Sequence, residues 1–197
     1  MDEFLRVEYE RCLDLLKYYD ERVMSLLKFS SGMGSAILGL IFGIQHVKDQ
    51  AMTPESWSLV ALMCAVTALG LTALFVIVVQ TRLYFIYPAR QVNGIRVAML
   101  TTVTATFSEN RMWVNSNTPA FRIRSGASFV HAFLALQIGV FAGLTIFAAG
   151  IYRWQEETVY FVAPFGGILM AVVLYVASAI YLKTCDKPHA DAMMTGE

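Results

Sequence analysis

The chain has 197 residues, of which 57% are hydrophobic and only 15% are charged, and its formal net charge is zero. A soluble domain carries about 25% charged residues, so this composition excludes an ordinary soluble domain and predicts a membrane protein. The charged residues are also segregated, because none lies in 29–47, 56–81, 125–152 or 158–182.

The N-terminal residues 1–28 are polar and have a helical periodicity. Their start, MDEFLRVEYERC, is acidic and lacks a basic region, so we expect no cleavable signal peptide. Apolar residues recur at alternating spacings of four and three, the pattern of a coiled-coil seam. This seam consists of Leu5, Tyr9, Cys12, Leu16, Tyr19, Val23 and Leu26. It indicates either self-association or partner docking, or packing on the chain's own central loop.

The first span is predicted at 29–47. No glycine or proline lies between Lys17 and Ser31, so we expect the N-terminal helix to continue into this span as one rod. Small residues recur in the spans at every fourth position, a ladder that lets another helix approach closely. The ladders are Ser31, Ser35, Gly39 and Gly43 in the first span, Ala135, Gly139 and Gly143 in the third, and Gly167 and Ala171 in the fourth. They do not tell whether the neighbouring helix belongs to the same chain.

The second span is predicted at 57–81, and its helical pattern continues past the bilayer to about Ala105. The stretch YPARQVNGIR, residues 87–96, follows the apolar run. Pro88 removes a backbone donor and favours a kink, and Gly94 adds backbone freedom. We therefore predict a hinge at Pro88 and Gly94, where the span turns into a cytoplasmic extension.

The third and fourth spans are predicted at 127–151 and 159–182, followed by a tail at 183–197. Thirteen of the fifteen Lys and Arg residues lie on the side of the N-terminus, against Lys48 and Arg153 on the other side. By the positive-inside rule, both termini and the loop 82–126 are cytoplasmic. The expected fold is an all-α protein of the bacterial inner membrane, with four transmembrane helices, an N-terminal cytoplasmic helix and a cytoplasmic extension of the second span.

Mildly polar residues inside the spans are candidates for lining a pore: Thr67, Thr72, His131 and Gln137. His131 lies one turn from the inner boundary, where it is either a water-facing or helix-bonded imidazole or a pH sensor or pore group. Gln137 lies deeper. It either forms a hydrogen bond across helices or contributes to a ring around a symmetry axis.

The central region is basic. Residues 82–124 contain six arginines against the single acid Glu109, whereas residues 1–28 have a net charge of −2. Arginine is the preferred residue for bidentate phosphate contacts. One interpretation is orientation plus attraction to anionic lipid headgroups. The other is a site for an anionic ligand formed by Arg90, Asn93, Arg96, Arg122 and Arg124.

Sequence motifs of enzymes are not found: there is no HExxH, P-loop or GxSxG. The cysteines Cys12, Cys64 and Cys185 are far apart and fit neither a metal site nor a disulfide framework. Carboxylates at membrane depth, the usual relays of coupled transporters, are also missing. We therefore predict no enzyme, metal site or cofactor, and we disfavour a transporter or a lipid-interacting enzyme.

A cytoplasmic helical stalk, four short-looped spans and no enzyme motif resemble the small transmembrane effectors of bacterial anti-phage defence, including the channel-like effector of Hailong systems. The resemblance implies a homo-oligomer, such as a tetramer, that opens an ion path in the inner membrane when a cytoplasmic nucleotide or nucleic-acid signal changes. It carries over no site residue.

Two functions thus stand side by side. The first is a channel or pore-forming effector gated by a cytoplasmic nucleotide, oligonucleotide or protein regulator. The alternative is a non-conducting scaffold whose N-terminal helix recruits a soluble partner. Membrane lipids are partners in both.

Overall fold

The computed structural model describes residues 3–47, 53–102, 119–151 and 156–186. Its regular structure in these ranges consists of four α-helices: α1 (Glu3–Val47), α2 (Pro54–Thr102), α3 (Gly126–Gly150) and α4 (Glu156–Cys185). Their membrane-side ends lie within a few residues of the predicted spans. The expectation of one rod from the polar N-terminal segment into the first apolar run is confirmed, because α1 is unbroken. The predicted loop at 103–118 and the tail from 187 lie outside the described residues.

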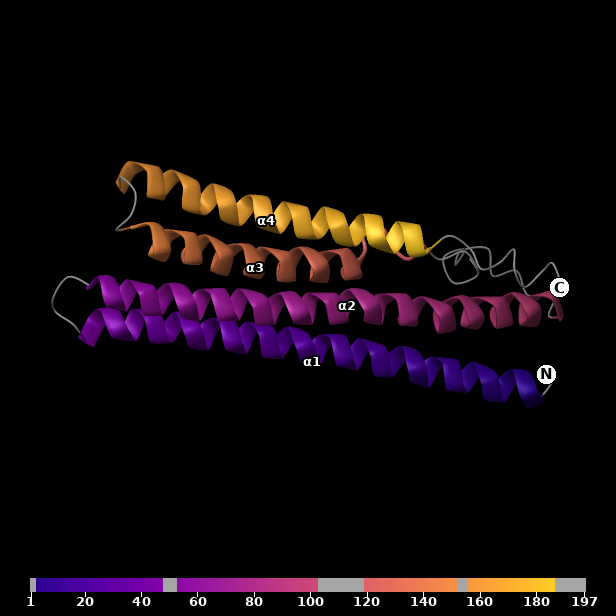
Figure 1. Cartoon of the computed structure of the whole chain (residues 1–197). Coiled ribbons are helices and arrows are strands. Elements are labelled where there is room, and N and C mark those ends of the chain that lie inside the picture. Colours follow the sequence, from indigo (N-terminus) through magenta and orange to yellow (C-terminus); the bar gives the residue numbers. More distant parts are fainter. Residues whose placement is uncertain (1–2, 48–52, 103–118, 152–155, 187–197) are drawn as a thin grey trace.

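The helices pack in chain order, each antiparallel to the next (Figure 1). The main contacts join α1 with α2, α2 with α3, and α3 with α4, and α1 also touches α3. The polar ends of α1 and α2 project together beyond α3 and α4 (Figure 1). At ~1.5 Å per residue each of these two helices is about 70 Å long, more than twice the ~30 Å hydrocarbon core. We call their paired segments 3–28 and 82–102 the stalk.

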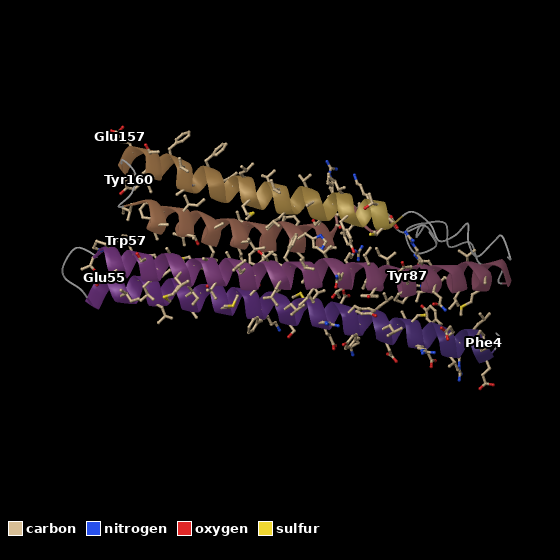
Figure 2. The ribbon with its side chains drawn as sticks, viewed as in Figure 1. Phe4, Glu55, Trp57, Tyr87, Glu157 and Tyr160 are labelled. Carbon is tan, nitrogen blue, oxygen red and sulfur yellow. The ribbon has the colours of Figure 1, made fainter. Side chains whose placement is uncertain are left out.

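Each of the four helices contains a segment long and apolar enough to cross a membrane. Aromatic side chains mark the ends of these segments. Trp57 and Tyr160 lie at the end opposite the stalk (Figure 2), and both pack on Phe147. Tyr84 and Tyr87 are exposed on α2 at the start of the stalk. The rise from Trp57 to Tyr84 is about 40 Å, close to the thickness of a bilayer with its interfacial regions, and aromatic residues favour those regions. The chain is a helical membrane protein.

The buried core lies where α1, α2 and α3 meet, and its best-covered side chains include Cys64, Leu71 and Leu134. The opposite face of α2 exposes apolar residues at spacings of three and four, namely Leu59, Leu62, Val66 and Leu69. In water such a stripe would be unfavourable, but a bilayer covers it. The two faces of α2 thus separate helix contacts from the lipid surface.

The small-residue ladders of the third and fourth spans pack against each other. A Cβ atom built on Gly167 would lie 2.5 Å from the carbonyl oxygen of Gly139, and one built on Gly143 would lie 3.0 Å from the carbonyl oxygen of Ala163. The backbones of α3 and α4 are therefore in direct contact, which only glycine permits at these positions. The ladder of α1 differs, since nothing lies within 4 Å of a Cβ built on Gly39 or Gly43.

Candidate functional site

The predicted seam of the N-terminal helix faces α2 of the same chain. All seven of its residues are buried or half-buried, and Cys12 is only 2% exposed. The Nε and Nη2 atoms of Arg96 donate to the Tyr9 hydroxyl oxygen at 3.2 and 3.0 Å, and the Arg96 guanidinium carbon lies 5.6 Å from the centre of the Tyr9 ring. Gln91 Nε2 donates to Glu8 Oε1 at 3.0 Å.

The structure therefore places the seam as in the second interpretation, with the helical extension of α2 in the role of the central loop. Self-association through these seven residues stays a prediction. It would require α1 to leave α2 or to use the edges of the seam.

The five residues of the predicted anion site are divided among different contacts. Arg90 pairs with the carboxylate of Asp186, just beyond α4, whose other oxygen accepts a hydrogen bond from the backbone N–H of Ala120 at 2.9 Å. Arg96 packs on Tyr9, and it also donates to the Oδ1 atom of the buried Asn93 at 3.5 Å.

The remaining two members, Arg122 and Arg124, are exposed on the segment that precedes α3. Two arginines thus fasten the stalk, and two face outward. The structure does not gather the five residues around one cavity.

The predicted hinge residues lie within an uninterrupted helix. Pro88 is buried in α2, and α2 continues through both Pro88 and Gly94 without a break (Figure 1). A Cβ atom on Gly94 would have nothing within 4 Å, so close packing does not explain the glycine. The hinge stays a prediction.

The pore candidates mostly satisfy their polar groups within the chain. Thr67 and Thr72 donate to the carbonyl oxygens of Met63 and Ala68 at 2.7 and 2.8 Å, one turn earlier in α2, a common arrangement for threonine in helices. Gln137 Nε2 donates to Ser31 Oγ of α1 at 3.5 Å, as expected for a bond across helices, and Gln137 Oε1 is buried without a partner. These residues do not converge on a path within one chain.

A cavity of about 420 Å³ lies between α1, α2 and α3, where α3 begins beside the stalk. It is lined by Tyr19, Asp20, Val23 and Met24 of α1, by Val78, Thr81, Arg82 and Phe85 of α2, and by Gly126, Ala127, Val130 and His131 of α3. Most of these side chains are apolar. None of the five residues of the predicted anion site is among them.

Arg82 supplies the positive charge of this cavity. Its Nε donates to the carbonyl oxygen of Ala120 at 3.3 Å, and its guanidinium carbon lies 4.9 Å above the centre of the Phe85 ring. In the described part of the chain no carboxylate lies within 4.0 Å of its nitrogens. Asp20 lines the same cavity from α1. Arg82 is thus held in place by a carbonyl and a ring, and its charge has no direct carboxylate partner in these ranges.

His131 is the predicted pore candidate that the fold brings to the cavity. It is 1% exposed, and its ring meets that of Phe75 edge-on with the centres 6.0 Å apart. The Nδ1 atom is buried without a hydrogen-bond partner. Such an atom costs free energy unless something pairs with it. The cavity therefore combines apolar walls, one cation and one unsatisfied nitrogen.

The sequence analysis missed the cavity because it counted Arg82 only as an orienting charge and gave Asp20 no role. A signal was available. Arg82 is the first charge after the second apolar run, and a continuous α1 places Asp20 about two turns before the first apolar run.

The chemistry of the described side chains favours binding. No group of three or more His, Cys, Asp or Glu residues suited to a metal ion occurs in the described ranges, and the buried cysteines Cys12 and Cys64 lie on different helices. Arg82 and His131 offer a charge and a hydrogen-bonding atom beside an apolar volume. No protein-family model matches this chain, and neither a curated protein nor a solved structure matches it.

Proposed function

We propose that this protein is an oligomeric channel or pore-forming effector of the bacterial inner membrane, controlled by an anionic signal from the cytoplasmic side. The observation that carries the proposal is the continuity of α1 and α2, which join the stalk to two apolar spans without a break. A role in anti-phage defence follows from the architectural resemblance alone.

Stiff continuity matters because a change at the stalk is then passed to the membrane segments. The Arg96–Tyr9 and Gln91–Glu8 contacts hold the two helices together, and the Arg90–Asp186 pair ties the stalk to the end of α4. An anion that draws an arginine away from these partners changes how the stalk packs. A ligand shifts such an equilibrium by its different affinity for the two arrangements.

Conduction in this proposal runs between copies of the chain. The polar span residues Thr67 and Thr72 bond within α2, whereas α1 exposes Ser35, Gly39 and Gly43. A face of small residues lets a helix from a second copy approach closely. We therefore place α1 at the contact between copies of a homo-oligomer such as a tetramer.

Reconstituted vesicles test the proposal. The parent protein should release K⁺ from liposomes, and ATP or oligodeoxythymidylate on the stalk side should change the rate. The exposed arginines are tested by changing Arg122 and Arg124 to glutamine, which should weaken the response to the anion.

A second variant pair tests the path between copies. Gly39→Leu combined with Gly43→Leu should abolish flux by blocking close approach of α1. Ala177→Leu, on the exposed face of α4, is the matched control and should leave flux unchanged. Absence of flux from the parent under all these conditions would replace the channel with the scaffold.

The scaffold alternative has its own supporting observation. On the stalk, α1 exposes Phe4, Val7 and Tyr18, with Phe4 at 70%, on the side that α2 does not cover. An apolar stripe outside the bilayer suits a soluble helical partner. If Phe4→Ser with Val7→Ser removes biological activity while flux stays intact, the partner and not conduction is the output.

A further inference from the structure

We propose that the cavity between α1, α2 and α3 binds an anionic amphiphile, with its phosphate or carboxylate group at Arg82 and its apolar chain along the cavity walls. This site is separate from the exposed arginines of the stalk. The inference does not require that the protein conduct ions.

The walls select an apolar chain. The cavity of about 420 Å³ falls within the usual range of ligand sites, and Val23, Met24, Val78 and Val130 contribute aliphatic surface from three helices. A nucleotide would need several polar partners for its phosphates, sugar and base, and this wall does not provide them. One charge beside an apolar volume fits a single headgroup on a hydrocarbon chain.

Arg82 selects the headgroup. A guanidinium makes short, charge-assisted hydrogen bonds with phosphate and carboxylate oxygens. The Nε atom already donates to Ala120, and Phe85 supports the guanidinium plane, so the cation is oriented before a ligand arrives. It also lies just beyond the second apolar run, which is the depth at which lipid headgroups begin.

His131 provides the second polar contact. Its Nδ1 atom is buried and unpaired, and an imidazole nitrogen can either donate or accept a hydrogen bond. A hydroxyl or ester carbonyl next to the headgroup would satisfy it. This unsatisfied atom, on the helix opposite α1, is an observation independent of the Arg82 charge.

Asp20 gives the site a direction of response. It lines the cavity from α1, and its carboxylate repels an anion that Arg82 attracts. Binding therefore has to overcome Asp20. Removing that carboxylate should strengthen binding, whereas removing the Arg82 charge should weaken it.

A binding titration on the purified full chain in a non-ionic detergent tests this site. The probes are dioctanoyl phosphatidic acid, decanoate, dioctanoyl phosphatidylcholine and inorganic phosphate. Phosphatidic acid or decanoate should bind saturably, and phosphatidylcholine and phosphate should bind at least about tenfold more weakly. Preference for phosphatidic acid identifies a membrane lipid as the source, and preference for decanoate identifies a free fatty acid.

Three variants complete the test. Arg82→Gln should weaken binding of the preferred probe by about tenfold or more, Asp20→Asn should tighten it, and the exposed control Arg124→Gln should leave it unchanged. If Arg82→Gln does not fold, the parent and Asp20→Asn decide alone.

The proposal is overturned if inorganic phosphate binds as well as the amphiphiles, if Arg82→Gln binds like the parent, or if Asp20→Asn fails to tighten binding. Because the readout is binding and not flux, a protein that binds but does not conduct refutes the channel and keeps this site.

Discussion

The small-residue ladders of α1 and of α3 have the same sequence pattern and different surroundings. On α3, Gly139 and Gly143 touch the backbone of α4, where Gly167 lies opposite. On α1, a Cβ on Gly32, Gly39 or Gly43 would meet nothing within 4 Å. The comparison shows that a ladder defines a face on which close approach is allowed. It does not define which helix arrives.

The energetic consequence follows from the membrane environment. Lipid tails are as apolar as leucine, so helices in a bilayer associate through close van der Waals packing and not through the hydrophobic effect. The α3–α4 contact already has this packing within one chain. On α1 the same gain is available only from a second molecule or from lipid.

The largest effect is expected from Gly167→Leu. The added side chain meets backbone atoms of Gly139, which cannot move aside as a flexible side chain can, so the α3–α4 contact has to open. We expect a loss of about 3 kcal/mol or more in the free energy of unfolding, measured by denaturant titration in detergent. Gly39→Leu is the matched change on the open ladder and should leave this free energy nearly unchanged. Equal losses in both would mean that the two ladders are not different.

The assembly of copies is the next largest effect. Gly39→Leu with Gly43→Leu should disrupt close approach of α1 to another copy, at about 1–3 kcal/mol per contact. That corresponds to a dissociation constant raised by roughly tenfold to a hundredfold. Light scattering in detergent should show smaller species. An unchanged oligomer would assign the open ladder to lipid.

The stalk repeats the comparison between a covered and an open face of α1. Tyr9 accepts two hydrogen bonds from Arg96, whereas Tyr18 is exposed. Tyr9→Phe should destabilise the stalk by about 1 kcal/mol, and Tyr18→Phe by almost nothing. Amide hydrogen exchange of residues 3–28 measures the difference. Faster exchange in both variants, or in neither, would contradict the role of Tyr9.

The smallest effect concerns the predicted hinge. Gly94 has room for a Cβ and lies inside α2, so Gly94→Ala should stabilise the helix by about 0.5–1 kcal/mol. If Pro88 and Gly94 form a hinge, the double change to alanine should also blunt the response of flux to the anion. A full response in the stiffened protein would remove the hinge from the mechanism.

The sequence by itself determined the local features of this protein. Long runs without charge predict apolar helices, and the lack of glycine or proline from residue 18 to 30 predicts that α1 is one rod, because helix formation depends on neighbours one turn apart. The bond from Gln137 to another helix was also predictable, since a buried amide needs a partner.

The tertiary structure decided which surfaces meet. It turned the seam of α1 onto α2, matched the ladder of α3 with Gly167, and engaged Arg90 with Asp186, 96 positions away. It also brought Arg82 and Asp20 to the cavity that His131 lines. Periodicity specifies the face on which a residue lies. Contacts between helices depend instead on how whole helices pack, and this long-range choice is not written in any single segment.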